Sequence, residues 1–532
     1  MAYDLIICNG SVHDGLGGEP LRVDVGVVGN RIAHVGELAA EEPAGVVLDA
    51  TGLAVCPGFI NPLSHSYYSV LEDGRSLGEL VQGVTTQVFG EGESMGPISP
   101  SLRATMQADA EEYGVEVSWT RLSEYLATVE ESGCTQNVSS LVGPQTVRVD
   151  VLGYEDRPAT PAELSRMCGL VAEEMADGAL GVGSSLIYAP GSYATTDELV
   201  ALCTVAAGYG GTYASHVRDE GVQLLPAIKE LLHIVREAGL HGEMWHLKAA
   251  GEPQWPLMEQ ALAMLSAARD EGLPITADVY PYTRSGTGLA STIPPRWHEG
   301  SAEALYDRLA DRHARQPIRD ELAALARWGD TPSAEDVLLL KLAHPDNNRW
   351  QGHTLAEVAA ARGQDPVDVT LDLLASERQR IFTAFHSMSE DNLQTELAQS
   401  WVGVCSDASS IAPEGARLAS PTHPRAYGAF ARVLGHYTRD LGVLRLPDAI
   451  RKMTSLPAAT FGFTDRGVLA AGYAADLVVF DPATVGDRAT FEQPHQLAVG
   501  VRDVVVNGVA ALRDGQPTGE RPGRALRRGR TV

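Results

Sequence analysis

The middle of the chain shows two patterns of apolar positions, one typical of strands and one typical of helices. Eight short runs are apolar enough and short enough for buried β-strands. Between several of them apolar residues recur at helical spacing, as at 161–176 and 256–271. Strands separated by helical crossovers predict an α/β protein built on a (β/α)8 TIM-like barrel. The predicted strands are 56–61, 85–90, 137–142, 179–183, 211–216, 243–247, 275–280 and 402–407.

Both ends of the chain have a different pattern, of short apolar strands with tight turns. The strand near residue 5 is followed by Asn9-Gly10 and the strand near residue 25 by Gly29-Asn30, which are hairpin signals. The same style returns at 476–480 and 504–509. We therefore predict one small β domain built from both termini, residues 1–55 and 464–517, beside a barrel of residues 56–463.

Two further segments fall outside this scheme. The span 283–400 is too long for one crossover, and it contains helical patterns at 302–328 and 354–376. We interpret it as an insertion that covers the barrel mouth as a substrate lid. The tail 518–532 is rich in Arg and Gly, which indicates a surface strap or a disordered end.

Composition narrows the class of protein. The chain has 532 residues, 44% hydrophobic and 21% charged, which is typical of a large globular protein. Its formal charge of −28 disfavours nucleic acid and anionic membranes as partners, but a few local cations would still allow an anionic small-molecule substrate. The six cysteines form no CxxC pair, and neither a signal peptide nor a long apolar run is present. These features predict a cytoplasmic protein and leave its oligomeric state open.

The candidate chemistry lies at the ends of predicted strands. His216, His246 and Asp407 each end such a strand, and in a parallel barrel these ends converge on one mouth. Two imidazoles suit Zn²⁺, and a carboxylate suits proton transfer from its bound water. A lone histidine there is more often structural, and Asp407 is also a reasonable helix N-cap. Because the two histidines lie one βαβ step apart and both are followed by charged residues, joint metal ligation is the better interpretation.

A competing motif points to a serine hydrolase. The run Gly92-Glu93-Ser94-Met95-Gly96 matches G-x-S-x-G and follows a predicted strand. A nucleophile elbow needs a helix directly after it, however, and Pro97 and Pro100 come instead. The motif is short, so we treat it as the weaker alternative.

The residues also carry a family resemblance. The chain resembles the N-acyl-D-amino-acid deacylase (D-aminoacylase) family of the amidohydrolase superfamily. The resemblance runs in order through nearly the whole chain. The matching stretches are Pro57-Gly58-Phe59-Ile60, Gln82-Gly83-Val84-Thr85-Thr86, Leu186-Ile187-Tyr188-Ala189-Pro190-Gly191, His216-Val217-Arg218-Asp219-Glu220, His246-Leu247-Lys248, Ala277-Asp278-Val279-Tyr280-Pro281-Tyr282, Ser406-Asp407, His423-Pro424-Arg425 and Ala474 to Pro482.

The resemblance implies roles for particular residues. It implies a metal-bearing barrel with a small β-sandwich and an inserted lid. His216 and His246 would be metal ligands, and Asp407 would be the catalytic base. Further side chains in the matching stretches would hold the substrate carboxylate, its carbonyl or the oxyanion. These are Lys248, Tyr280, Arg425 and Tyr188.

Two departures from the family pattern concern the metal. The superfamily has His-x-His after the first strand, but this chain has Leu63-Ser64-His65, and leucine cannot ligate a metal. The more exposed metal position therefore keeps His65 and Asp407 and is expected to be weak or empty. D-aminoacylases also have a metal-binding cysteine after strand 2. Aligning the glycines places Glu91 there, with Glu93 as a less favoured substitute, and a carboxylate can replace a thiolate on Zn²⁺.

These observations predict a hydrolase with one tightly bound Zn²⁺. Its expected reaction is the deacylation of an N-acyl-D-amino acid. Two alternatives stay open. One is a metal-dependent hydrolase of a cyclic amide, dipeptide or carbamate, and the other is a catalytically silent relative that binds a ligand.

Overall fold

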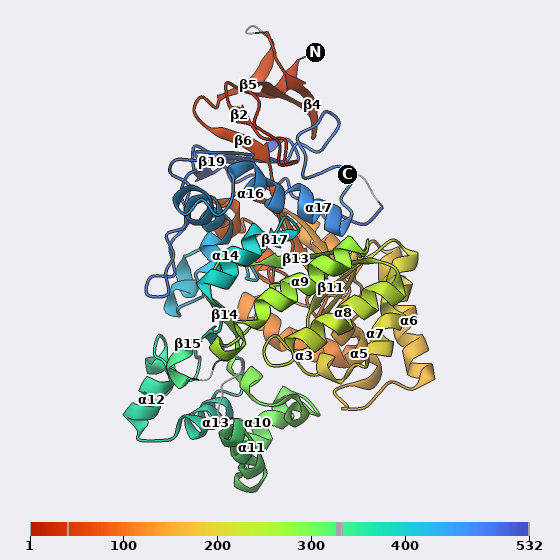
Figure 1. The fold of residues 1–532 in the computed structure, drawn as a ribbon, viewed down its shortest axis with the longest axis vertical. Coiled ribbons are helices and arrows are strands. Elements are labelled where there is room, and N and C mark those ends of the chain that lie inside the picture. The colour runs from red at the N-terminus through yellow and green to blue at the C-terminus, as the bar shows by residue number, and fades with distance from the viewer. Residues whose placement is uncertain (1, 40–41, 326–330, 332, 530–532) are drawn as a thin grey trace.

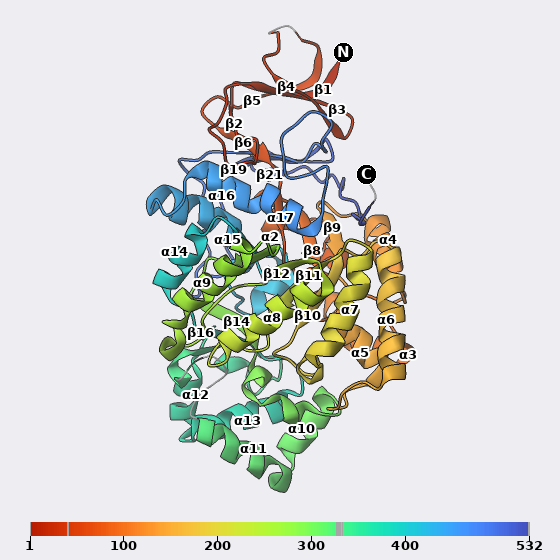
Figure 2. The same ribbon diagram turned by 45° about the vertical axis from the view of Figure 1, so that its right-hand side comes forward.

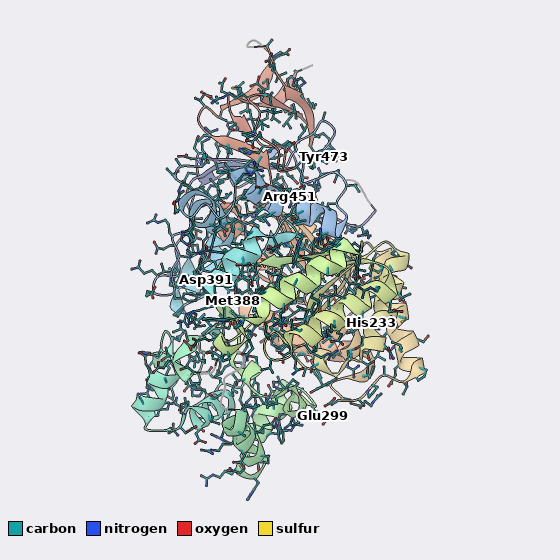
Figure 3. The ribbon with its side chains drawn as sticks, viewed as in Figure 1. His233, Glu299, Met388, Asp391, Arg451 and Tyr473 are labelled. Atoms are coloured by element: carbon teal, nitrogen blue, oxygen red, sulfur yellow. The ribbon has the colours of Figure 1, made fainter. Side chains whose placement is uncertain are left out.

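The chain is described by a computed structural model that covers residues 2–39, 42–325, 331 and 333–529. The N-terminal sheet lies at one end of the molecule, the parallel strands and their helices form the middle, and helices α10–α13 lie at the other end (Figures 1 and 2). Figure 3 shows Tyr473 toward the end with the N-terminal sheet and Glu299 toward the opposite end.

Eight parallel strands form the middle of the molecule. One three-stranded sheet has the order β7-β8-β9, and a five-stranded sheet has the order β10-β11-β12-β13-β17. Isolated parallel bridges, Val142 to Val182 and Ser64 to Ala408, join these sheets at both edges. The strand order therefore returns to its starting strand. The bounds are β7 (Phe59–Asn61), β8 (Val84–Phe89), β9 (Asn137–Ser140), β10 (Gly181–Ser185), β11 (Thr212–His216), β12 (His241–Met244), β13 (Ile275–Val279) and β17 (Val402–Val404).

Helices cover the outside of these strands (Figure 2). Helix α6 follows the predicted bounds because Thr160 caps its N-terminus in a capping box with Glu163. The apolar faces of the covering helices pack on the parallel strands in one large core. The helices are α1 (Ser69–Glu72), α2 (Leu77–Leu80), α3 (Pro100–Ala110), α4 (Leu122–Ser132), α5 (Pro144–Leu152), α6 (Pro161–Ala176), α7 (Thr196–Gly208), α8 (Leu224–Ala238), α9 (Leu257–Asp270), α14 (Glu390–Ala398), α15 (Arg425–Arg432), α16 (Leu446–Met453) and α17 (Ser455–Phe461).

One predicted strand is in fact two. The run 56–61 divides into the end of β6 (Ala54–Pro57) and β7, which belong to different sheets. Gly58 lies between them against Thr85, where a Cβ atom would come within 2.1 Å of that side chain's oxygen. The chain therefore passes from the terminal β region to the parallel strands at a position that accommodates only glycine.

The terminal segments form two sheets. Residues near the N-terminus form a four-stranded sheet, and both termini contribute to a six-stranded one. Apolar side chains from both sheets share one core. The first sheet contains β4 (Arg31–Gly36), β3 (Asp24–Val28), β1 (Tyr3–Cys8) and β5 (Ala44–Asp49). The second contains β2 (Ser11–Val12), β6, β18 (Leu477–Phe480), β19 (Val501–Val506), β20 (Val509–Arg513) and β21 (Gln516–Pro517).

Of the hairpins predicted in the N-terminal segment, one is confirmed and one is wrong. Gly29-Asn30 joins β3 to β4, which pair antiparallel. Asn9-Gly10 instead carries the chain from one terminal sheet to the other, because β2 pairs with β6 and not with β1.

The segment 283–400 contains more than the predicted helices. It includes an antiparallel sheet of order β14-β16-β15, which the sequence did not predict, and a core of its own. The predicted run 302–328 is broken into two helices at Asp311, and residues 326–328 lie outside the described part of the chain. The elements are β14 (Arg284–Gly288), α10 (Ala302–Ala310), α11 (Arg312–Leu325), β15 (Val337–Lys341), α12 (Leu355–Arg362), α13 (Pro366–Glu377) and β16 (Phe382–His386).

The described part of the C-terminal tail straps the parallel strands. Ala525 forms a parallel bridge with Val138, and the backbone N–H of Leu526 donates to the carbonyl of the same valine. Arg528 donates from its backbone to Gly178. Within the described residues, no helix combines the length and the apolar character needed to cross a membrane.

Candidate active site

The predicted chemical residues come together at the carboxyl ends of the parallel strands. His216 ends β11, His246 follows β12 by two residues, and Glu91 follows β8 by two. His65 lies four residues after β7 and Asp407 three residues after β17. The strand direction therefore delivers these five side chains to one place, although 342 residues separate His65 from Asp407.

A first group consists of Glu91, His216 and His246. Glu91 Oε1 lies 2.8 Å from His216 Nδ1 and 3.4 Å from His246 Nε2. Tetrahedral Zn²⁺ with ligand bonds of about 2.0–2.2 Å separates its donor atoms by about 3.3–3.6 Å. The three donors lie within 4.8 Å of one another and are mostly buried. The distance from Glu91 to His246 lies in this range, whereas the distance from Glu91 to His216 is that of a hydrogen bond. Two imidazole nitrogens and a carboxylate oxygen are donors that suit a zinc ion.

A second group shares Glu91 with the first. His65 Nε2 lies 3.2 Å from Glu91 Oε2 and 2.9 Å from Asp407 Oδ1. Glu91 therefore directs one oxygen to each group, as a bridging carboxylate does. Leu63, which takes the place of a family histidine, is completely buried in the main apolar core and offers no metal donor. Glu93 belongs to neither group among the described residues.

The backbone around these residues is unusual. Gly90 and Gly92, on either side of Glu91, have φ angles of 108° and 70°, which glycine adopts without strain. His246 and Asp407 have φ angles of 36° and 48°, in the left-handed region that non-glycine residues rarely occupy. Such conformations are held by surrounding structure and concentrate at functional sites.

The charges of the first group depend on one another. Burial alone would raise the pKa of Glu91, but hydrogen bonds with His216, His246 and His65 hold it well below its usual range. Burial would likewise lower the pKa of His216, yet Glu220 and Glu91 raise it to about 10. A buried carboxylate surrounded by imidazoles attracts a cation, whether it is protons on the rings or a metal ion between them.

Asp407 is held by two cationic partners. Burial would raise its pKa, but Arg425 and His65 lower it to about 2. Arg425 Nη1 donates to Asp407 Oδ2 at 2.6 Å, and its other terminal nitrogen donates to the Gly286 carbonyl at 3.0 Å. Asp407 is therefore ionised and held in place by both partners. The guanidinium of Arg425 pairs with Asp407, and Arg425 does not line the cavity, so its expected role as a substrate clamp stays a prediction.

Lys248 is also engaged inside the protein. Its ammonium group donates to Glu220 at 2.6 Å and lies 2.8 Å from His246 Nδ1. Lys248 lines the cavity. Its charge, however, is opposed by the carboxylate of Glu220, which is 3% exposed. The expected contact with a substrate carboxylate would therefore compete with a buried ion pair.

A cavity of about 810 Å³ opens above the two groups. The inserted segment supplies part of its wall, including residues 285–288 of β14, residues 290–296 and Arg380. Tyr280 and Tyr188 also line it, and Tyr188 exchanges a 2.8 Å hydrogen bond with Thr287 of β14. Burial raises the pKa of both tyrosines well above the usual value, so they remain hydrogen-bond donors.

Two residues at this site were not predicted from the sequence. Arg380 lines the cavity, and among the described residues no carboxylate lies within 4 Å of its guanidinium, in contrast to Arg218 and Arg296. It precedes a strand of the inserted segment, where no local pattern distinguishes it. Glu220 lies beside both candidate ligand histidines. Its position four residues after His216 was the available signal.

Ser94 has no partner that would activate it. Its hydroxyl donates to the Gly96 carbonyl at 2.6 Å and accepts from the Gly143 N–H at 2.9 Å. No histidine is among the hydrogen-bond partners of Ser94 in the described chain. The serine is buried and holds a turn together, so the geometry does not favour a serine hydrolase.

A mixed α/β fold with imidazole and carboxylate donors at the ends of its parallel strands defines the class, a metal-dependent hydrolase. Comparison with known proteins agrees. A model described as "Amidohydrolase family" matches residues 420–511. The chain is 34% identical to a D-aminoacylase of Alcaligenes xylosoxydans xylosoxydans over 527 residues, 99% of this chain and 98% of that protein. An N-acyl-D-glutamate deacylase of the same organism is also 34% identical, over 99% of this chain and 97% of that one.

Solved structures give the same result. A crystal structure of D-aminoacylase superimposes with a TM-score of 0.80 at 34% identity, covering 99% of this chain and 100% of the other. N-acyl-D-glutamate deacylase from Bordetella bronchiseptica, in complex with zinc and a phosphonate inhibitor, gives 0.82 at 30% identity over 99% and 100% of the chains. The chain belongs to the D-aminoacylase family of the amidohydrolase superfamily. It is a metal-dependent enzyme that acts on amide C–N bonds other than peptide bonds.

Proposed function

We propose that this protein uses one tightly bound zinc ion to deacylate an N-acyl-D-amino acid. The observation that carries the proposal is the convergence of Glu91, His216 and His246 donor atoms within 4.8 Å beneath the cavity. Relatives that match the chain end to end are named as a D-aminoacylase, an N-acyl-D-glutamate deacylase and an N-acyl-D-aspartate deacylase. One of the similar structures holds zinc.

The second metal position is expected to be the weaker one. It offers His65, Asp407 and the shared Glu91, and it lacks the imidazole that Leu63 replaces. Arg425 already neutralises Asp407, which lowers the attraction of this group for a second cation. A structural study of a related D-aminoacylase describes a binuclear centre with one-metal activation and second-metal attenuation. Activity from the first position alone is consistent with that description.

The side chains divide the reaction between them. A zinc ion held by the first group would supply an activated water and would polarise the acyl carbonyl. Asp407 is ionised and lines the cavity, so it would accept a proton at Oδ1 or Oδ2 and return it to the leaving nitrogen. Tyr280 keeps its hydroxyl proton and would donate it as a hydrogen bond to the developing oxyanion.

Substrate charge is the next element of the proposal. Arg380 is a cation on the cavity wall, and it forms no ion pair with a carboxylate of the described residues, so we assign the substrate carboxylate to it. Lys248 and Arg425, the residues expected from the sequence, would act on their buried partners instead. Tyr188 would help to shape the site beside Thr287.

We also propose an architecture for this site. The eight parallel strands, with bridges at both edges, support a closed (β/α)8 barrel of residues 56–463. The two terminal sheets with their common core support a small β-sandwich domain of residues 1–55 and 464–517. The insertion, about 283–400, supplies one wall of the cavity, as expected of a lid.

The test joins metal analysis to a substrate panel. The purified protein should contain about one zinc per chain, lose activity to a chelator and regain it with zinc. It should hydrolyse N-acetyl-D-amino acids in preference to their L-enantiomers. Hydantoinases share the fold at 13–18% identity. Turnover of hydantoins or dipeptides without turnover of N-acyl-D-amino acids would therefore favour the alternative substrate class. A chain without stoichiometric metal or hydrolysis would be the silent relative.

A further inference from the structure

The two candidate ligand histidines share a second carboxylate, that of Glu220. His246 Nδ1 lies 3.0 Å from Glu220 Oε1, and His216 Nε2 lies 3.5 Å from Glu220 Oε2. The second distance is longer than a hydrogen bond, but His216 Nε2 is buried and has no closer polar partner among the described residues. All three side chains are between 2% and 6% exposed. Glu220 is therefore the acceptor available to both rings.

The nitrogen atoms are arranged in a consistent way. His216 directs Nδ1 to Glu91 and Nε2 to Glu220, whereas His246 directs Nε2 to Glu91 and Nδ1 to Glu220. A neutral imidazole that binds a metal through one nitrogen carries its proton on the other. An acceptor placed at that other nitrogen selects the metal-binding tautomer and fixes the ring. One carboxylate with two oxygens can do this for both rings.

Lys248 makes the burial of this carboxylate tolerable. Its ammonium donates to Glu220 Oε1 at 2.6 Å, and the lysine is 2% exposed. The same ammonium lies 2.8 Å from His246 Nδ1. If Lys248 donated to that nitrogen, the ring proton would move to the metal side. Glu220 and Lys248 therefore favour opposite tautomers of His246.

We propose that Glu220 is a positioning residue that holds both His216 and His246 in their metal-binding form, with Lys248 as its counter-charge. The inference rests on the proposed metal site. It goes beyond that site because Glu220 lies at the ring nitrogens that do not face Glu91, and it acts through the two rings. It also gives Lys248 a role that needs no contact with substrate.

The informative substitution is Glu220→Gln, which keeps the size of the side chain but reduces its hydrogen-bond acceptor oxygens from two to one. A glutamine offers one oxygen acceptor and one NH₂ donor. Whichever ring faces the NH₂ group is turned toward the tautomer whose proton lies on the metal side. Loss of such a supporting partner typically weakens metal binding by about 10–100-fold. The backbone carbonyl of Glu220, which accepts from Ala250, is unchanged.

Metal affinity is measured directly, by zinc competition between the purified protein and a chromophoric chelator. Glu220→Gln should bind zinc about 10–100-fold more weakly than the wild type. Asp219→Asn is the matched control. It removes the same charge from the adjacent residue, whose Oδ1 accepts from the N–H groups of Gly221 and Gln223 and contacts neither histidine. The control should bind zinc with wild-type affinity.

A second pair of variants covers failure to fold. Glu220→Gln/Lys248→Met removes both buried charges and should fold while still binding zinc weakly. Lys248→Met alone removes the opposing donor but also the counter-charge of Glu220, so it should bind zinc more tightly than Glu220→Gln does. Wild-type zinc affinity in Glu220→Gln or in the double variant would overturn the proposal, as would binding in Lys248→Met no tighter than that in Glu220→Gln. Absence of zinc from the wild type would instead refute the proposed function.

Discussion

Replacing Asp407 by Asn tests the proposed proton transfer at its centre. The amide has nearly the same shape as the carboxylate, and its oxygen can still accept from Arg425. It cannot take up a proton at neutral pH. Glu91, His216 and His246 are untouched, so the variant should keep its tightly bound metal. The change therefore separates metal binding from catalysis.

The structure sets the expected size of both effects. Loss of a general base typically reduces rates about 10²–10⁴-fold, or about 2.7–5.4 kcal/mol in transition-state free energy. Asp407 accepts from Arg425 at 2.6 Å and is 7% exposed. The variant leaves this buried guanidinium facing a neutral partner, which costs about 1–3 kcal/mol of stability. A lower melting temperature with full metal content and little activity is the expected combination.

The assay is initial-rate hydrolysis of an N-acetyl-D-amino acid beside zinc quantification of the same preparation. Asp487→Asn is the control. Asp487 is another carboxylate paired with an arginine, here Arg432, but Asp487 does not line the cavity. It should keep activity near the wild type. If Asp407→Asn retained both zinc and near-normal turnover, Asp407 would not be the base.

Three further substitutions test the other assignments. Glu91→Ala should weaken zinc binding by at least about 10-fold, since it removes one of three donors, and unchanged zinc content after dialysis would contradict the ligand set. Arg380→Met should raise KM for a free-acid substrate about 10–100-fold, which corresponds to the loss of a charge-assisted hydrogen bond. KM for the carboxamide of the same substrate should not change, and an equal rise for both substrates would reject the assignment. Ser94→Ala should lower stability by about 1–3 kcal/mol and keep activity within a few-fold, whereas a loss like that of Asp407→Asn, with labelling by a serine-directed phosphonate, would revive the serine hydrolase.

The sequence by itself determined most of the helices and strands in the middle of the chain, and which side chains lie at the strand ends. The periodicity of 161–176 and 256–271 predicted helices that the structure has as Pro161–Ala176 and Leu257–Asp270. A parallel strand places its last residues at a predictable edge, so the sequence placed His216, His246 and Asp407 at the same edge, as the structure does. Their roles in catalysis stay predictions. Family membership was also predicted correctly from motifs spread along the chain.

Only the tertiary structure decided which charges are free. Arg425, Lys248 and Arg380 are all cations near the cavity, and nothing local in the sequence distinguishes them. Folding pairs Arg425 with Asp407 and Lys248 with Glu220, and leaves Arg380 on the cavity wall. Strand and helix patterns report contacts within a few residues, whereas an ion pair depends on side chains that meet from distant elements. The role of a buried charge is therefore set by its partner, and the fold chooses that partner.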